Sequence, residues 1–211
     1  LLGSATANGA GAWSFTTAAL ANGAHSLTAT ATDVAGNTST ASSALSVTID
    51  AAAPVVPSIT AFSTDSGTAG DGVTNDNTLT LTGSAEANAT VKVYDGVTLL
   101  GSATADGSGN WSYTTAALTN GAHSLTATAT DAAGNTSAAS SALSVTIDTS
   151  APATPAIASF STDSGVVGDH ITNDNTLTLA GTTEAGSVVK VYDGATLLGS
   201  ATADGSGNWS Y

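Results

Sequence analysis

Short stretches in which apolar residues alternate with small polar ones recur along the whole chain. Successive side chains of a β-strand point to opposite faces, so such alternation describes a strand with one buried face. Within residues 90–95, Val91 and Val93 share one face, and Lys92 and Tyr94 share the other. No stretch carries apolar residues at the sustained 3.6-residue spacing of an amphipathic helix. The pattern predicts an all-β chain.

Gly, Asn and Asp separate these stretches and mark the turns between strands. Between residues 51 and 148 we expect seven strands, at 59–62, 78–83, 90–95, 98–105, around Trp111 and Tyr113, at 122–130 and at 139–148. Seven short strands in about 100 residues are typical of an antiparallel Greek-key sandwich. Strands with one polar face also argue against a parallel sheet, whose strands read as continuous apolar runs.

The same sequence returns every 98 residues, because LLGSATA begins at Leu1, Leu99 and Leu197. Residues 1–50 match 99–148 at 43 of 50 positions, and 51–113 match 149–211 at 45 of 63. A period of this length indicates one small domain repeated in tandem. We therefore expect the C-terminal half of a module at 1–50, a complete module at 51–148 and the N-terminal two-thirds of another at 149–211. Such a chain is expected to be part of a longer array.

The joints between modules are short and contain proline. The run VTID is followed by AAAP at Pro54 and by TSAP at Pro152. Proline fixes its φ angle and has no N–H to donate, so it suits the start of an edge strand. Three or four residues are too few for a flexible tether. Neighbouring modules are therefore expected to stack end to end with limited freedom.

The charge is strongly unbalanced, with 16 Asp and Glu residues against Lys92, Lys190 and no Arg. The formal net charge of −14 excludes binding to nucleic acid or to an anionic membrane surface, since both rely on Lys and Arg. The carboxylates must be solvated or neutralised by cations. The chain has no Cys. Because it has no 18-residue apolar run and no charged segment before an apolar stretch, we expect neither a membrane span nor a signal peptide within these residues.

Several long motifs resemble one protein family. VKVYDGVTLLGSATADGSGNWSY, ALTNGAHSLTATATDAAGNTS and the closing SVTID with Ala-Pro are similar to the bacterial immunoglobulin-like modules of large repetitive surface adhesins and biofilm-associated proteins. The resemblance spans essentially the whole chain. It implies an immunoglobulin-like sandwich, an extracellular place at the bacterial cell surface, and calcium that stiffens the array. It does not imply catalysis.

An acidic segment at residues 63–77 carries the most suggestive candidate ligands, Asp65, Asp71 and Asp76. The equivalent residues in the next copy are Asp163, Asp169 and Asp174. Carboxylates spaced by glycines suit Ca²⁺, which takes six to eight oxygen ligands and accepts backbone carbonyls. The alternative is a solvated loop in which the Asp side chains cap their own backbone.

Sandwich topology predicts where these carboxylates meet. The loop after the first strand lies at the end where the last strand leaves, so the acidic segment should lie near Asp148 and face the next module at Glu184. The corresponding set at the preceding joint is Asp50, Glu86 and Asp131. A Ca²⁺ ion at such a joint would bridge two modules. Asp131 has an equally simple alternative as the cap of its own turn.

Aromatic and imidazole side chains also have two interpretations. Trp111 and Tyr113 are expected in the core, the alternative being an exposed platform for sugars. His25 and His123 begin equivalent strands and are expected as corner residues bonded to the backbone.

No nucleophile motif and no phosphate-binding loop points to an enzyme. The sequence predicts a structural stalk whose partners are the neighbouring modules of the same chain, while other domains could contact surface or matrix glycans and proteins. The alternatives are a glycan-binding module, a spacer within a secreted hydrolase and a subunit of an extracellular filament.

Overall fold

A computed structural model describes residues 1–211. The strands are β1 (Gly23–Leu27), β2 (Leu45–Ile49), β3 (Ser58–Ser63), β4 (Val73–Thr74), β5 (Thr80–Ser84), β6 (Thr90–Asp95), β7 (Thr98–Thr104), β8 (Asn110–Thr114), β9 (Gly121–Thr130), β10 (Leu143–Ile147), β11 (Ala156–Phe160), β12 (Leu179–Thr182), β13 (Val188–Asp193), β14 (Thr196–Thr202) and β15 (Asn208–Ser210). The predicted all-β fold is confirmed. Because the chain forms strands only, it has no helix that could span a membrane.

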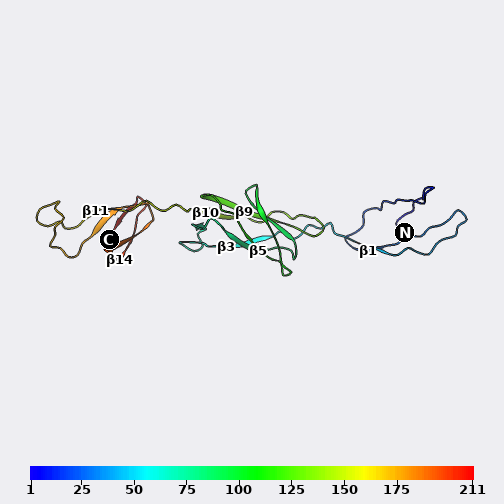
Figure 1. Cartoon of the computed structure of the whole chain (residues 1–211), viewed down its shortest axis with the longest axis horizontal. Coiled ribbons are helices and arrows are strands. Elements are labelled where there is room, and N and C mark those ends of the chain that lie inside the picture. The colour runs from blue at the N-terminus through cyan, green and yellow to red at the C-terminus, as the bar shows by residue number, and fades with distance from the viewer. The chain divides into compact units, whose positions relative to one another are not determined.

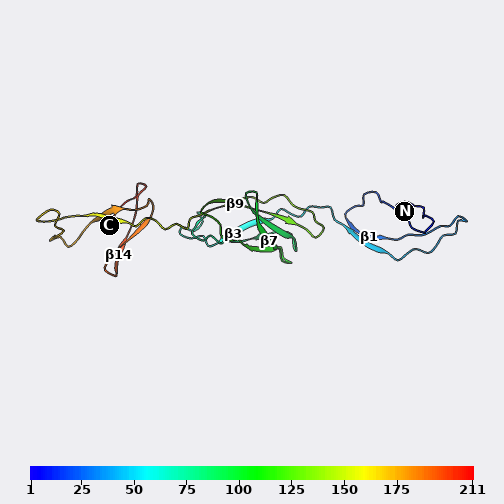
Figure 2. The same cartoon turned by 45° about the horizontal axis from the view of Figure 1, so that its top comes forward.

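The chain divides into two compact units, Leu1–Thr149 and Ser150–Tyr211. The first unit contains a sandwich of two sheets, with strand orders β3-β5-β8 and β4-β10-β9-β6-β7. In Figure 1, β9 and β10 lie on one side of this sandwich and β3 and β5 on the other, and Figure 2 again separates β9 from β3. The two-sheet sandwich predicted from strand spacing is confirmed.

The core lies between these two sheets. Its buried side chains are Leu79, Leu81, Val91, Val93, Ala105, Trp111, Leu125, Ala127, Val145 and Ile147. They are the inward residues of each alternating stretch, as the period-2 pattern requires. Trp111 is only 3% exposed, so its predicted place in the core is confirmed.

One strand was not expected. The acidic segment contains β4, which pairs in parallel with β10 through Val73 opposite Thr146 and Thr74 opposite Ile147. The N–H of Thr146 donates to the carbonyl of Gly72 at 2.8 Å. The sandwich is therefore not wholly antiparallel. Two residues are too few to show alternation, which is why the sequence indicated only a loop here.

Strand β10 is shorter than the predicted 139–148. Before it, the hydroxyls of Ser137 and Ser140 accept the N–H groups of Ala129 and Ala127, each at 3.0 Å. The N–H groups of the same serines return to the carbonyls of Ala129 and Ala127. Two side chains therefore take part in the pairing beside β9. The equivalent bonds in the first copy join Ser39 to Ala31 and Ser42 to Ala29.

The second unit repeats the same local pairings. Its sheets have the orders β11-β12-β15 and β13-β14, and its core consists of Val189, Val191, Ala203 and Trp209. In residues 1–50, β1 and β2 form an antiparallel pair. The complete module and the second unit therefore share these pairings, whereas residues 1–22 of the first copy form no strand and Trp13 is 60% exposed.

A tyrosine joins the two sheets of the sandwich. The hydroxyl of Tyr113 on β8 donates to the carbonyl of Leu100 on β7 at 2.7 Å. Its ring covers Gly101, where an added Cβ would lie 2.4 Å from the hydroxyl oxygen. A side chain at this position would therefore displace the ring. Tyr211 repeats the bond in the second unit, donating to the carbonyl of Leu198.

We expect Tyr113→Phe to lower the free energy of unfolding by about 1 kcal/mol, because a partly buried carbonyl loses its donor. Thermal unfolding followed by circular dichroism should show a melting temperature lower by roughly 4–8 °C. Tyr94→Phe is the matched control, since the Tyr94 hydroxyl makes no hydrogen bond within the described chain. Equal melting temperatures for the two variants would contradict this role of Tyr113.

Candidate functional site

The acidic segment lies beside the end of the last strand. The N–H of Asp148 donates to the carbonyl of Thr74 at 2.9 Å, directly after the β4–β10 pair. This is the position expected from sandwich topology. Asp148 and the acidic segment therefore share one end of the module.

Each carboxylate of the segment accepts hydrogen bonds from its own loop. Asp65 accepts the N–H of Gly70, Asp71 accepts that of Val73, and Asp76 accepts both the N–H and the hydroxyl of Thr78. The same three contacts recur in the next copy, in the pairs Asp163 with Gly168, Asp169 with Ile171 and Asp174 with Thr176. Hydrogen bonds from Thr176 lower the pKa of Asp174. Backbone capping, the alternative to metal binding, describes these contacts directly.

One oxygen of the segment has no partner. The Oδ1 atom of Asp65 is buried without a hydrogen bond, and so is Oδ1 of its equivalent Asp163. A buried carboxylate oxygen left without a hydrogen bond or a counter-charge is costly. A cation would meet that need with backbone carbonyls as further ligands. However, no three acidic or His side chains anywhere in the chain are grouped to hold a metal ion. Calcium therefore stays a prediction.

The residues of the preceding joint meet in a different way from the one expected. The side-chain amide of Asn135 donates to the carbonyl of Asp50 at 3.1 Å and to the carboxylate of Asp131 at 2.8 Å. Asp50 and Asp131 are thus linked through a third residue rather than through a cluster of carboxylates. Glu86 is exposed in the turn before β6, and its carbonyl accepts the N–H of Ala89.

The linker after Asp50 is bonded to the module that it leaves. The N–H of Ala51 donates to the side chain of Asn22 at 3.1 Å, and that of Ala52 to the Asp50 carboxylate at 3.0 Å. The N–H of Thr149 makes the equivalent bond to Asn120 at 3.2 Å, and its hydroxyl donates to the same side-chain oxygen at 2.8 Å. These asparagines were not expected as joint residues, since a lone Asn–Gly pair indicates only a turn. Glu184 is exposed in the second unit, so its meeting with Asp148 stays a prediction.

Asp131 belongs to a turn motif, Asp-x-x-Gly-Asn, that occurs four times. It begins at Asp33, Asp106, Asp131 and Asp204. In each turn the first carboxylate accepts the N–H of the Asn four residues later, at 2.9 Å. Hydrogen bonds from these asparagines lower the pKa of all four carboxyl groups. Asp131 is therefore a turn cap in this structure.

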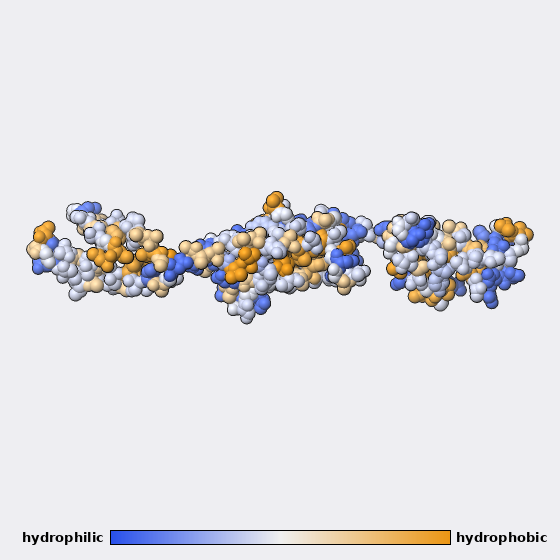
Figure 3. All heavy atoms as spheres, turned by 180° about the vertical axis from the view of Figure 1, so that it is seen from behind, coloured by the Kyte–Doolittle hydropathy of each residue, from blue (hydrophilic) through white to orange (hydrophobic).

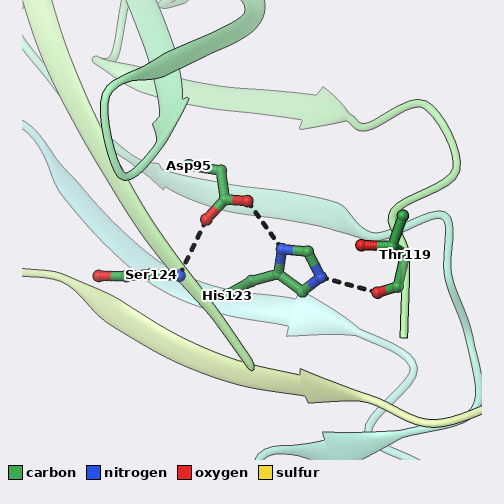
Figure 4. Close-up of polar contacts among 4 residues, drawn as sticks. All are labelled: Asp95, Thr119, His123 and Ser124. Carbon is green, nitrogen blue, oxygen red and sulfur yellow. Dashed lines mark hydrogen bonds and ion pairs between the residues drawn. The ribbon is translucent and has the colours of Figure 1, made fainter. Parts of the chain in front are cut away.

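A His–Asp pair connects two turns of the complete module (Figure 4). Nδ1 of His123 lies 2.7 Å from Oδ2 of Asp95, and Nε2 lies 2.8 Å from the carbonyl of Thr119. The N–H of Ser124 donates to the other oxygen of Asp95 at 3.0 Å. The expected backbone bond of the corner histidine is confirmed. Its carboxylate partner was missed, because 28 residues separate the two in sequence.

The geometry favours a charged imidazole. A carbonyl and a carboxylate can only accept hydrogen bonds, so both ring nitrogens of His123 must carry a proton to satisfy them. The hydrogen bond with Asp95, followed by that with Thr119, raises the pKa of His123 above its ordinary value. Burial raises the pKa of Asp95, but the hydrogen bonds from His123 and Ser124 outweigh burial and hold that pKa below its ordinary value.

The pair should make folding stability depend on pH in a defined direction. The contribution of His123 is fully present below its ordinary pKa of 6.5 and is lost as pH rises through its raised folded-state value. That of Asp95 is present above 3.8 and is lost as pH falls through its lowered folded-state value. Melting temperatures measured from about pH 3 to about pH 9 should decline toward both extremes, and His123→Gln should flatten the alkaline decline. His25→Gln is the control, because His25 bonds only to the carbonyl of Ala21. An alkaline decline unchanged in His123→Gln would contradict the assignment.

Comparison with known proteins shows the family. The model of the bacterial Ig-like domain matches residues 1–51, 52–149 and 151–211, so the chain belongs to this family in tandem form. The chain is also 36% identical over 209 residues to Exoglucanase B of Cellulomonas fimi. That match covers 90% of the chain but only 18% of the relative, so the chain is similar to a minor part of a larger protein.

Proposed function

We propose that this chain is a stalk or spacer segment of an extracellular repetitive protein at the bacterial cell surface, where it supports adhesion or biofilm formation. Three observations support this proposal. The chain consists of tandem bacterial Ig-like modules, the linker at Asp50 is bonded on both sides, and no motif for catalysis occurs in the sequence. A non-catalytic spacer holds other domains at a distance and needs defined joints more than a binding pocket.

The proposed stalk is stiffened by Ca²⁺ at the acidic segment. The observation that carries this step is the buried, unpartnered Oδ1 of Asp65, which recurs at Asp163 in the next copy. Asp71 and Asp76 follow Asp65 in the same segment and accept backbone N–H groups through Oδ1. A bound cation supplies positive charge to a segment with no Lys or Arg of its own. In its absence the carboxylates repel one another and the segment loosens.

Calcium should therefore stabilise the folded chain. At a free concentration about 100 times the dissociation constant, a ligand that binds only the folded state adds about 2.7 kcal/mol. We expect added CaCl₂ to raise the melting temperature, excess EGTA to lower it, and small-angle scattering to show a longer average chain with calcium. The double variant Asp65→Asn, Asp163→Asn should lose both effects.

The matched control is Asp193→Asn, which removes an exposed carboxylate outside the acidic segment. It should respond to calcium as the unmodified chain does. If EGTA changes neither melting temperature nor scattering, the calcium step is wrong, and the spacer role then rests on the protein contacts alone.

A second candidate is a spacer within a secreted polysaccharide hydrolase. The observation that favours it is the similarity to part of Exoglucanase B. In that case the modules would separate a catalytic domain from the rest of its protein. Sequencing of the DNA that encodes the flanking regions distinguishes the two, because a glycoside hydrolase domain beside the array supports this candidate and further tandem modules support the stalk.

The glycan-binding and filament roles find less support in the side chains that the modules expose. A sugar platform needs an exposed ring, and the tryptophans of the two cores, Trp111 and Trp209, are each 3% exposed, whereas Trp13 in the partial first copy is 60% exposed. A filament built through an apolar face needs a continuous apolar surface. Figure 3 shows small apolar areas separated by hydrophilic ones on the face that it displays.

A further inference from the structure

The linker between residue 50 and β3 is held from both sides. On the upstream side, Asn22 and the Asp50 carboxylate accept the N–H groups of Ala51 and Ala52. On the downstream side, Pro54 and Pro57 are buried. The remaining contact comes from the turn between β9 and β10, where Asn135 donates to the carbonyl of Asp50.

Both N–H groups of the Asn135 side-chain amide are used in this arrangement. Its two N–H groups meet two acceptors, the carboxylate of Asp131 and the carbonyl of Asp50. Both partners can only accept, so the NH₂ group and not the amide oxygen must face them. In the three other Asp-x-x-Gly-Asn turns, the Asn amide bonds only to the Asp of its own turn. Asn135 is therefore distinguished by what lies beside it and not by its sequence motif.

We propose that the turn at residues 131–135 is a docking surface for the last residue of the preceding module, with Asn135 as the latch that holds the joint. The acceptor is a main-chain carbonyl, so the contact does not depend on the identity of the side chain at position 50. The Asp131 carboxylate fixes the amide in the orientation that reaches the neighbour. The latch requires no cation.

This inference rests on the proposed spacer function and deepens it. The latch involves Asn135, Asp131 and Asp50, none of which lies in the acidic segment that is proposed to bind Ca²⁺. Asn37 occupies the equivalent position in the first copy and is held by Asp33 in the same way. The same turn is thus formed in both copies that contain it.

The latch can be tested in the full chain, which has no cysteine of its own. Nitroxide labels at Ser46→Cys in β2 and Ser102→Cys in β7 report the distance across the joint by pulsed electron paramagnetic resonance. Asn135→Ser removes the latch, and Asn110→Ser removes the same amide from a turn of the same type that does not contact the linker. Each variant is measured with calcium and with EGTA, and its melting temperature is recorded.

We expect one narrow distance distribution in the unmodified chain and in Asn110→Ser, and loss of that narrow peak in Asn135→Ser under both conditions. Similar melting temperatures for the two variants would show that the loss comes from the joint and not from unfolding. A narrow peak retained in Asn135→Ser, or equal broadening in Asn110→Ser, would overturn the latch. If EGTA alone broadens the distance distribution of the unmodified chain, the joint depends on a cation. That result would overturn the latch and support the proposed role of calcium. If the narrow peak depends on Asn135 but EGTA changes neither the melting temperature nor the scattering, the latch stands and the proposed role of calcium is wrong.

Discussion

A chain with many turns and a slim core must find partners for backbone N–H groups that no β-ladder reaches, because an unpaired buried N–H is costly. Here short polar side chains provide those partners. Ser137 and Ser140 complete the pairing beside β9, and Asp131 closes the turn that follows. With only 5% aromatic residues and no cysteine, the chain relies on these side-chain-to-backbone bonds where another protein would use a larger core or a disulfide.

Natural substitutions between the copies show which of these features are kept and which are lost when the residue changes. Asn8 replaces the capping Asp in the first copy, and its side-chain oxygen still accepts the N–H groups of Ala10 and Ala12. Phe15 stands where the other copies have a tyrosine, so the bond between the sheets is absent there. His170 replaces Gly72 and keeps the left-handed backbone, with φ of 61° against 72°. The acceptor oxygen and the backbone conformation persist although the residue changes.

The same chemistry extends to the joint. A linker whose N–H groups are bound upstream and whose carbonyl is bound downstream loses much of the freedom that a short flexible peptide would keep. This arrangement suits a spacer, whose purpose is to hold distance. The joint therefore has two separate sources of stiffness. Hydrogen bonds to the main chain need no ion from solution, whereas the carboxylates of the acidic segment depend on counter-charge.

The sequence alone determined the strands, their inward faces, the tandem organisation and the place of Trp111 in the core, because alternation and turn residues act over a few neighbouring positions. It also placed the acidic segment beside Asp148. Tertiary structure decided the rest. The pairing of β4 with β10, the partner of His123 and the contact of Asn135 with Asp50 join residues that are distant in sequence. The asparagines of all four turns carry the same local signal, and only the position of a neighbouring module makes one of them a joint residue.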